Sequence, residues 1–140
     1  MPEAARLAQR QSRGASYEVF ADNSKECIKA IERNLRSILG RDGPDKARVI
    51  LKDAVVAIRL LYSEKEKFDI IFLDPPYYRN WVRKCLKNLN TYDILAPYAF
   101  IICEHFKKDD IPLELSPFKL LRQLAYGDTM ISIYKKSTLK

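Results

Sequence analysis

The sequence is poor in several features on which whole classes of protein depend. It has three cysteines, one histidine, four glycines and no apolar run long enough to cross a membrane. Its first ten residues also lack the apolar core of a signal peptide. Cys27, Cys85 and Cys103 are odd in number and lack metal-ligand spacing, so we expect free core thiols, a reducing cytoplasm and no metal site. Cys103 and His105 are two residues apart, so we expect both on one face of a strand, and they do not make a set of metal ligands.

What is present is the composition of a globular domain. The chain has 140 residues, 47% of them hydrophobic, so we expect one domain over residues 1–140 with a buried core. The formal net charge of +7 favours a polyanionic partner. Two of the basic clusters are best explained as solvated faces. They consist of Arg6, Arg10 and Arg13, and of Lys135, Lys136 and Lys140.

The most informative stretch is Phe68–Tyr77, which reads Phe-Asp-Ile-Ile-Phe-Leu-Asp-Pro-Pro-Tyr. Its apolar first half predicts a strand buried on both faces. Pro75 and Pro76 lack an amide hydrogen and cannot extend a sheet, so the strand should end at Asp74. A carboxylate and the Tyr77 ring then lie at the carboxyl end of a central strand, where open α/β sheets bind ligands.

This segment suits the methylation of an amine attached to a nucleobase. The exocyclic nitrogen is a poor nucleophile, because its lone pair is delocalised into the ring. The Asp74 carboxylate and the Pro75 carbonyl can accept its two N–H bonds and turn the lone pair towards an electrophilic methyl group. Pro76 adds no competing donor, and Tyr77 offers a face on which a flipped base can stack. The alternative, which we favour less, is a plain turn in which Asp74 caps the next helix.

Strands and helices alternate along the chain, which predicts a doubly wound α/β sheet. The helix after the Ser24 cap should carry an apolar stripe made of Cys27, Ile28, Ile31, Leu35 and Ile38. A closing antiparallel pair should turn at Tyr126-Gly127-Asp128. The expected strands cover residues 17–21, 47–51, 68–74, 99–103, 118–125 and 129–134, and the other helices cover residues 53–62 and 81–89.

Acids also follow two earlier predicted strands. Asp22, with Asn23 beside it, takes the position at which nucleoside-binding α/β folds hold ribose hydroxyls. Asp53 follows the next strand, where its carboxylate can accept from an adenine amine and the N–H of Ala54 can donate to a ring nitrogen. Alternatively, Asp22 and Asn23 are turn residues and Asp53 only caps its helix. The order of these acids, ahead of Asp74, favours one cofactor site that includes all three.

A basic cluster follows the Asp-Pro-Pro-Tyr segment. A helix at this point would flank the mouth of the pocket, so its cations can hold the phosphates of a nucleic acid. We predict this role for Arg79, Arg83, Lys84 and Lys87.

Several segments together resemble the RsmD-like family of bacterial 16S rRNA guanine-N2 methyltransferases. They are Ser12–Ala15, Phe20–Asp22, Phe68–Tyr77, Glu104-His105 and Tyr126–Thr129. The resemblance implies a class I, Rossmann-like methyltransferase fold and S-adenosylmethionine as the methyl donor. It also implies a guanine amine in small-subunit ribosomal RNA, naked or assembled, as the acceptor. By motif, Asp22 would contact the cofactor ribose, Asp53 and Ala54 the adenine, and residues 74–77 the target base.

The N-terminal region departs from this family, whose first strand ends in a glycine-rich turn that holds the methionine part of the cofactor. All four glycines lie elsewhere in this chain: Gly14, Gly40, Gly43 and Gly127. We expect Met1–Gln11 to be a remnant or replacement of the helix that follows the turn. The central first strand would then be missing, with a gap between the strands ending at Asp22 and Asp74. We therefore expect weak or absent binding of S-adenosylmethionine.

Three explanations of this departure stay open. The chain is a fragment or late start of a longer protein, which we favour; or the sheet closes differently, with contacts from a second copy; or the chain binds RNA or a partner without catalysis. Two other functions stay open as well. One is methylation of adenine N6 in DNA or another RNA, and the other is a non-catalytic RNA-binding module.

Overall fold

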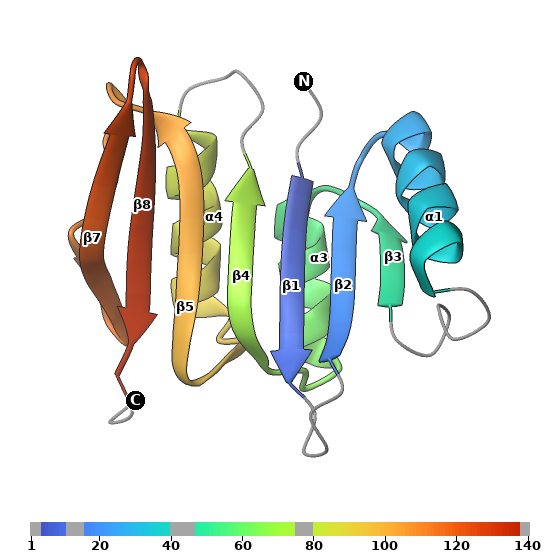
Figure 1. The fold of residues 1–140 in the computed structure, drawn as a ribbon. Coiled ribbons are helices and arrows are strands. Elements are labelled where there is room, and N and C mark those ends of the chain that lie inside the picture. The colour runs from blue at the N-terminus through green and yellow to red at the C-terminus, as the bar shows by residue number, and fades with distance from the viewer. Residues whose placement is uncertain (1–3, 11–15, 40–46, 75–79, 138–140) are drawn as a thin grey trace.

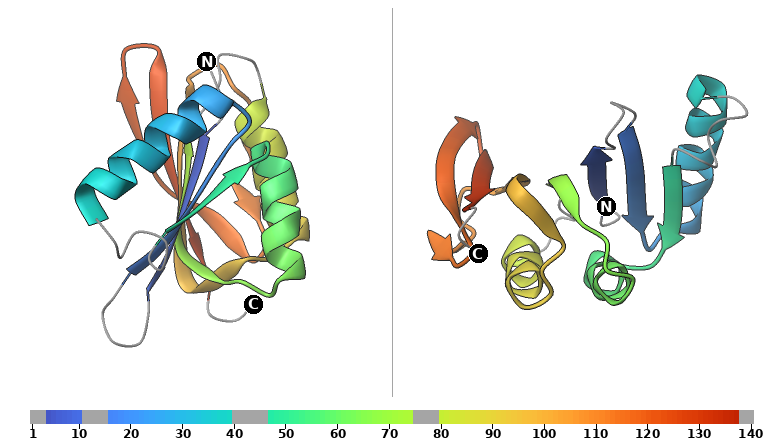
Figure 2. Two further views of the ribbon diagram at one scale, coloured as in Figure 1. Left: turned by 90° about the vertical axis from the view of Figure 1, so that its right-hand side faces the viewer. Right: turned by 90° about the horizontal axis from the view of Figure 1, so that it is seen from below.

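The computed structural model describes residues 4–10, 16–39, 47–74 and 80–137. These residues form one eight-stranded sheet with the order β3-β2-β1-β4-β5-β8-β7-β6 (Figure 1). Helices α3 and α4 cover one face, and α1 lies on the other face beside β2 and β3 (Figure 2). The strands are β1 (Ala4–Arg10), β2 (Ser16–Asp22), β3 (Ala47–Leu51), β4 (Phe68–Asp74), β5 (Leu95–Phe106), β6 (Glu114–Leu115), β7 (Phe118–Tyr126) and β8 (Thr129–Lys136). The helices are α1 (Lys25–Leu39), α3 (Ala54–Ser63) and α4 (Trp81–Thr91).

The predicted elements are present, and two of the strands have the predicted bounds. β3 covers residues 47–51 and β4 covers residues 68–74. β5 begins at Leu95, four residues earlier than expected. Leu95 pairs with Phe68 of β4, and a register shift follows before Ile70 pairs with Phe100. β7 and β8 form the expected antiparallel hairpin, in which Gly127 has a φ of +56° that suits glycine.

The N-terminal residues form a strand, so the predicted helix remnant is wrong. β1 runs antiparallel to both β2 and β4, and Ala4 pairs with Asp22 on one side and with Asp74 on the other. The expected gap in the sheet is therefore filled, although by a strand of reversed direction. The physical reason is tertiary: the facing edges of β2 and β4 offer two ladders of backbone hydrogen bonds. These outweigh the helical propensity of a segment rich in alanine and arginine.

The main core lies between the sheet and the pair of helices α3 and α4. Ile71 and Leu73 of β4 are buried on this side, whereas Ile70 and Phe72 on the other face are only half-buried. The prediction of a strand buried on both faces is thus met on one face. Other fully buried side chains are Ile58, Leu61, Phe68, Leu86, Leu89, Ile94, Leu95, Phe118 and Tyr134.

The cysteines have different environments. Cys85 and Cys103 are buried, as predicted, whereas Cys27 is half-buried. Burial and the neighbouring Cys85 raise the pKa of the Cys103 thiol, which makes it a poor nucleophile. Within the described ranges, no three His, Cys, Asp or Glu side chains form a group that could hold a metal ion. No helix in those ranges has the length and apolar character needed to cross a membrane.

Candidate active site

Four acids lie along one edge of the sheet, each at or near the carboxyl end of a different strand. They are Asp22 at the end of β2, Asp53 after β3, Asp74 at the end of β4 and Glu104 near the end of β5. Since Ala4 pairs with both Asp22 and Asp74, these two acids lie at the same level of the sheet. One strand separates them, so their backbones are about 10 Å apart. The structure thus brings together the three acids that the sequence predicted and adds a fourth.

Asp74 is the exposed acid at the end of β4. It does not cap the next helix: the N-cap of α4 is Asn80, whose carbonyl accepts a hydrogen bond from the N–H of Lys84 at 3.0 Å. Asp74 is therefore not the helix cap that the plain-turn alternative proposed. Its carboxylate remains accessible to a ligand. The other members of the motif, Pro75, Pro76 and Tyr77, lie outside the described residues, and their roles remain predictions.

Glu104 is the member of the site that the sequence analysis missed. Leu73 of β4 pairs with Cys103 of β5, so the next residues along, Asp74 and Glu104, are neighbours on parallel strands. Their carboxyl groups are close enough to influence each other. Burial and the neighbouring charged Asp74 raise the pKa of Glu104. The sequence carried a signal, because Glu104 directly follows the predicted strand 99–103, as the other acids follow theirs.

Asp22 is the last residue of β2, and its side chain also holds the turn that follows, as one of the alternatives proposed. Only 2% of it is exposed, and its Oδ1 accepts a hydrogen bond from the N–H of Ser24 at 2.8 Å. Asn23 beside it is exposed. The Ser24 Oγ in turn accepts from the N–H of Cys27 at 3.3 Å, which is the predicted cap of α1. A contact of Asp22 or Asn23 with a cofactor ribose remains a prediction.

Asp53 is the N-cap of α3, again as the alternative proposed. Its Oδ1 accepts from the N–H of Val56 at 2.9 Å. This hydrogen bond uses one of the two carboxylate oxygens. Asp53 is half-buried and the neighbouring Ala54 is fully buried, so the backbone at this corner is fixed by packing. A contact of Asp53 and Ala54 with adenine remains a prediction.

The basic cluster predicted to bind nucleic acid lies on α4, except for Arg79, which is outside the described residues. Arg83 Nη1 is 3.1 Å from Asp110 Oδ2, so its charge is partly compensated. Lys84 and Lys87 are exposed, and neither forms an ion pair within the described ranges. These two lysines are therefore the cations of the cluster that remain available for phosphates.

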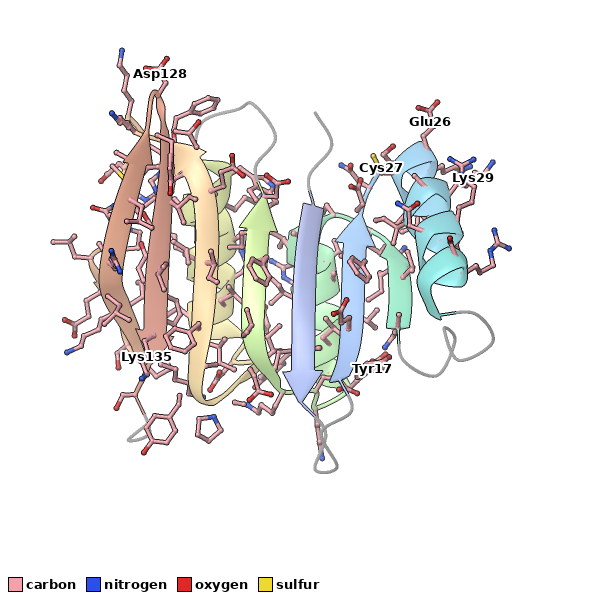
Figure 3. All side chains as sticks on the ribbon, in the orientation of Figure 1. Tyr17, Glu26, Cys27, Lys29, Asp128 and Lys135 are labelled. Carbon is pink, nitrogen blue, oxygen red and sulfur yellow. The ribbon has the colours of Figure 1, made fainter. Side chains whose placement is uncertain are left out.

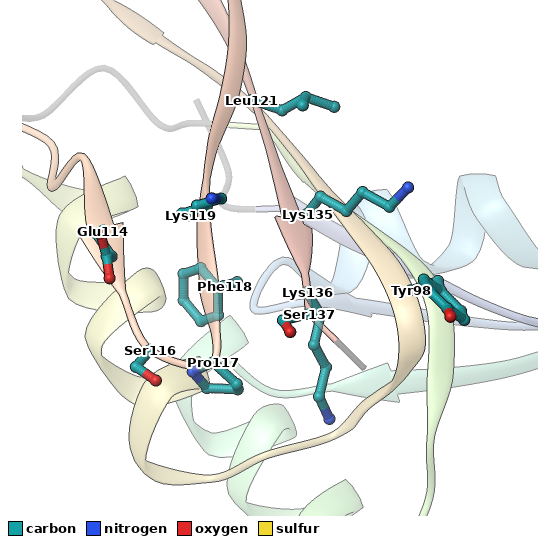
Figure 4. Close-up of a pocket in the computed structure, with 10 residues that line it drawn as sticks. All are labelled: Tyr98, Glu114, Ser116, Pro117, Phe118, Lys119, Leu121, Lys135, Lys136 and Ser137. Atoms are coloured by element: carbon teal, nitrogen blue, oxygen red, sulfur yellow. The ribbon is translucent and has the colours of Figure 1, made fainter. Parts of the chain in front are cut away.

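A separate hollow of about 510 Å³ lies at the opposite edge of the sheet, by the start of β7 and the end of β8. Figure 4 shows the residues that line it. The Lys135 ammonium lies over the rings of Tyr98 and Phe100, 5.7 and 5.2 Å from their centres. Figure 3 shows Lys135 at the end of the hairpin away from Asp128. None of the four acids lines this hollow. The lining residues are Tyr98, Glu114, Ser116, Pro117, Phe118, Lys119, Leu121, Lys135, Lys136 and Ser137.

Lys136 is not the solvated residue that the sequence predicted. It is only 8% exposed, and its Nζ donates to Asp93 Oδ2 at 2.9 Å and to the carbonyl of Leu95 at 2.7 Å. Burial of its stem requires such partners for the ammonium group. Lys136 therefore ties the end of β8 to the start of β5.

His105 is structural, as predicted. Its ring is buried on the same face of β5 as Cys103, and its Nδ1 donates to the carbonyl of Phe106 at 2.8 Å. That leaves Nε2 as an acceptor for the hydroxyl of Ser132 at 2.7 Å, and Gln123 donates to the same hydroxyl at 2.9 Å. Both ring nitrogens are satisfied by the protein, so His105 is not positioned as a catalytic base.

The chain matches one family model and two relatives whose names describe them as methylating enzymes. Residues 8–135 match the model of the family described as "Conserved hypothetical protein 95". The chain is 30% identical over 125 residues to "Putative rRNA methyltransferase YlbH" of Bacillus subtilis, covering 89% of this chain and 66% of that protein. It thus spans just under two thirds of this relative. A second relative, "Uncharacterized methylase RP545" of Rickettsia prowazekii, is 31% identical over 71 residues, 51% of this chain and 30% of its own length.

Solved structures share the fold. A "putative methylase HI0767" of Haemophilus influenzae has a TM-score of 0.70 at 22% identity, covering 85% of this chain and 71% of its own. A structure described as "Crystal structure of SMU.776, a putative methyltransferase complexed with SAH" has a TM-score of 0.56 at 15% identity, covering 82% and 38%. The predicted α/β, Rossmann-like methyltransferase fold is confirmed, with the reversed β1 as its local departure.

Proposed function

Since this chain belongs to the family described as Conserved hypothetical protein 95, the RsmD-like family that its motifs resemble, we propose a function on that basis. The chain is proposed to be an S-adenosylmethionine-dependent methyltransferase of small-subunit ribosomal RNA. Its proposed acceptor is the N2 amine of a guanine. The observation that carries the proposal is the exposed Asp74 at the carboxyl end of a central strand, in a row of four acids. The name of the Bacillus relative supports RNA as the substrate.

Asp74 performs the central step in this proposal. Its carboxylate accepts an N–H of the guanine amine, which draws the nitrogen lone pair out of conjugation with the ring. The Pro75 carbonyl is proposed to accept the second N–H, and the Tyr77 ring to stack on the base. S-adenosylmethionine supplies an electrophilic methyl group on a sulfonium centre when bound. The chain then contributes orientation and a fixed distance between the two reactants, which is the main source of rate in such a transfer.

The chain fits one half of the cofactor better than the other. Asp22 and Asp53 lie at or just after the ends of the neighbouring parallel strands β2 and β3, and they are suited to the nucleoside half. For the methionine half, a glycine-rich turn is absent from the sequence, and the corresponding place in the sheet is taken by Ala4 at the start of β1. We therefore keep the expectation of weak binding, as a property of this chain.

Methyl transfer can be tested directly with tritiated S-adenosylmethionine. The acceptors are small-subunit RNA, assembled small subunits and duplex DNA. We expect transfer to an RNA acceptor, and loss of at least about 100-fold in rate for Asp74→Ala, which removes the positioned acceptor. The fold should persist, because Asp74 is exposed and contributes little to the core. Near-normal turnover of Asp74→Ala with an intact circular dichroism spectrum would contradict the role of this acid.

The same assay separates the other two functions. Transfer to duplex DNA, with a product identified as N6-methyladenine, would replace the guanine assignment. RNA binding that survives Asp74→Ala, with no transfer to any acceptor at any concentration of cofactor, would indicate a non-catalytic binding module.

The surface that binds RNA is proposed to be α4. Reversal of both charges, by Lys84→Glu with Lys87→Glu, should weaken RNA binding about tenfold or more and lower the salt dependence of the affinity. The matched control is Lys119→Glu with Lys135→Glu, since these two lysines lie at the opposite edge of the sheet. A larger loss in the control than in the α4 variant, measured by filter binding, would move the RNA surface to the hollow at that edge.

A further inference from the structure

We propose that Glu104 is a specificity-determining residue, which together with Asp74 selects guanine by accepting its N1–H. The inference rests on the proposed function and goes one step further, because it assigns the choice of base to a particular side chain. Asp74 would accept an N–H of the N2 amine, and Glu104 would accept the hydrogen on the adjacent ring nitrogen.

The geometry supports two acceptors working side by side. The pairing of Leu73 with Cys103 puts Asp74 and Glu104 on neighbouring parallel strands, at the same level. Both residues are exposed, and their carboxyl groups are close enough to influence each other electrostatically. On its other side Glu104 pairs with Ile131 of β8, an apolar residue that offers no competing donor. The two groups thus form one continuous acceptor surface.

The chemistry of the two purines explains why such a pair discriminates. Guanine presents two kinds of donor in a row, the N1–H and the N2 amine, and ionised carboxylates only accept. Adenine presents its amine beside an N1 lone pair, which would face the Glu104 carboxylate and be repelled. Asp74 alone would hold an amine on either base. The second carboxylate is what makes the site selective for a ring nitrogen that carries a hydrogen.

The proximity of the two carboxyl groups is consistent with this use. Burial and the neighbouring Asp74 carboxylate raise the pKa of Glu104, because two negative charges this close repel each other. A guanine edge brings two donors and offers one to each acid, which offsets this repulsion. The site therefore favours a ligand with adjacent donors.

A pair of nucleotide probes tests the assignment. Guanosine 5′-monophosphate and 2-aminopurine riboside 5′-monophosphate both carry the C2 amine, but only guanosine has the N1–H. We expect the wild-type chain to prefer guanosine monophosphate about tenfold in an NMR titration. In Glu104→Gln, the amide can donate to the N1 lone pair of 2-aminopurine. The two probes should then bind about equally well, or the preference should reverse. The two probes also differ at O6, but that difference is the same for both proteins.

Glu114→Gln is the matched control, since Glu114 is an exposed glutamate at the opposite edge of the sheet. It should keep the wild-type preference. An unchanged preference in Glu104→Gln, or a wild-type chain that does not distinguish the probes, overturns the inference. The titration measures binding and not transfer. A preference that depends on Glu104, without any methyl transfer, would therefore support the role of Glu104 and contradict only the proposed enzymatic function.

Discussion

At the scale of single residues, acids at strand ends divide into two groups. Asp22 and Asp53 each use a carboxylate oxygen to hold the first turn after their strand. Asp74 and Glu104 cap no described helix, and their exposed carboxyl groups lie on neighbouring strands and influence each other electrostatically. This division follows from what comes next in the chain. A helix begins within three residues of Asp22 and directly after Asp53, whereas the helix after Asp74 begins at Trp81.

The ion pair of Asp93 with Lys136 gives a prediction for stability. Asp93→Asn removes the charged partner of a buried ammonium, which keeps only the carbonyl of Leu95. Because the Asp93 side chain is 35% exposed, solvent screens part of this cost. We expect a loss of about 1–2 kcal/mol in the free energy of unfolding at pH 7. Chemical denaturation checks this value, and Asp110→Asn, whose partner Arg83 is more exposed, should cost less.

The same pair should make stability depend on pH. Partial burial by itself raises the pKa of Asp93, but hydrogen bonds from Lys136 and from the N–H of Leu95 lower it below its ordinary value. The stabilisation is therefore present above the unfolded-state pKa of about 3.9 and lost as the pH falls through the folded-state pKa. The difference between wild type and Asp93→Asn should stay constant above about pH 5 and shrink as the pH falls below about 4. A difference that does not shrink at low pH would contradict the ion pair.

At the scale of elements, β1 is the strand on which the continuity of the sheet depends. It pairs with β2 along seven residues and with β4 along five. The sequence of this segment did not indicate a strand, because its apolar and polar residues do not alternate clearly. The decisive factor was the pair of open strand edges on either side of it. One belongs to β2, the next strand in the chain, and the other to β4, which begins only at Phe68.

Proline substitution tests this position. Leu7 pairs with Val19 on one side and with Ile71 on the other, so Leu7→Pro breaks a ladder at the centre of the sheet. We expect a loss of about 3 kcal/mol or more in the free energy of unfolding. Glu114→Pro, in the two-residue edge strand β6, is the control and should cost about 1 kcal/mol or less. Equal effects, measured by thermal unfolding, would show that β1 is not a central strand.

At the scale of the whole molecule, the direction of β1 determines what the ligand-binding edge offers. The carboxyl ends of β2, β3 and β4 reach this edge, but β1 contributes its first residue, Ala4. No carboxyl end with a glycine-rich turn stands between Asp22 and Asp74 to receive the polar end of a cofactor. The site therefore has acids that suit a base and a ribose, but it lacks the glycine-rich turn that would hold the methionine part of the cofactor.

This arrangement gives a prediction for ligand binding by the whole chain. Isothermal titration with S-adenosylmethionine should give weak or no binding, with a dissociation constant of about 1 mM or above, which is the weak end of specific affinities. Adenosine should bind almost as well, because the nucleoside half of the site is the better-formed half. Micromolar affinity for S-adenosylmethionine, well above that for adenosine, would show that the missing turn does not matter.

The sequence by itself determined the alternation of strands and helices, the end of β4 at Asp74 and the acids after three strands. These are local properties, set by apolar periodicity, by prolines without a donor and by caps a few residues long. Only the tertiary structure decided that residues 4–10 form a reversed central strand, that Lys136 is buried and that Glu104 joins Asp74. Each of these depends on a partner far away in the chain, at a position set by how the strands pair: β4 for β1, Asp93 for Lys136 and Asp74 for Glu104.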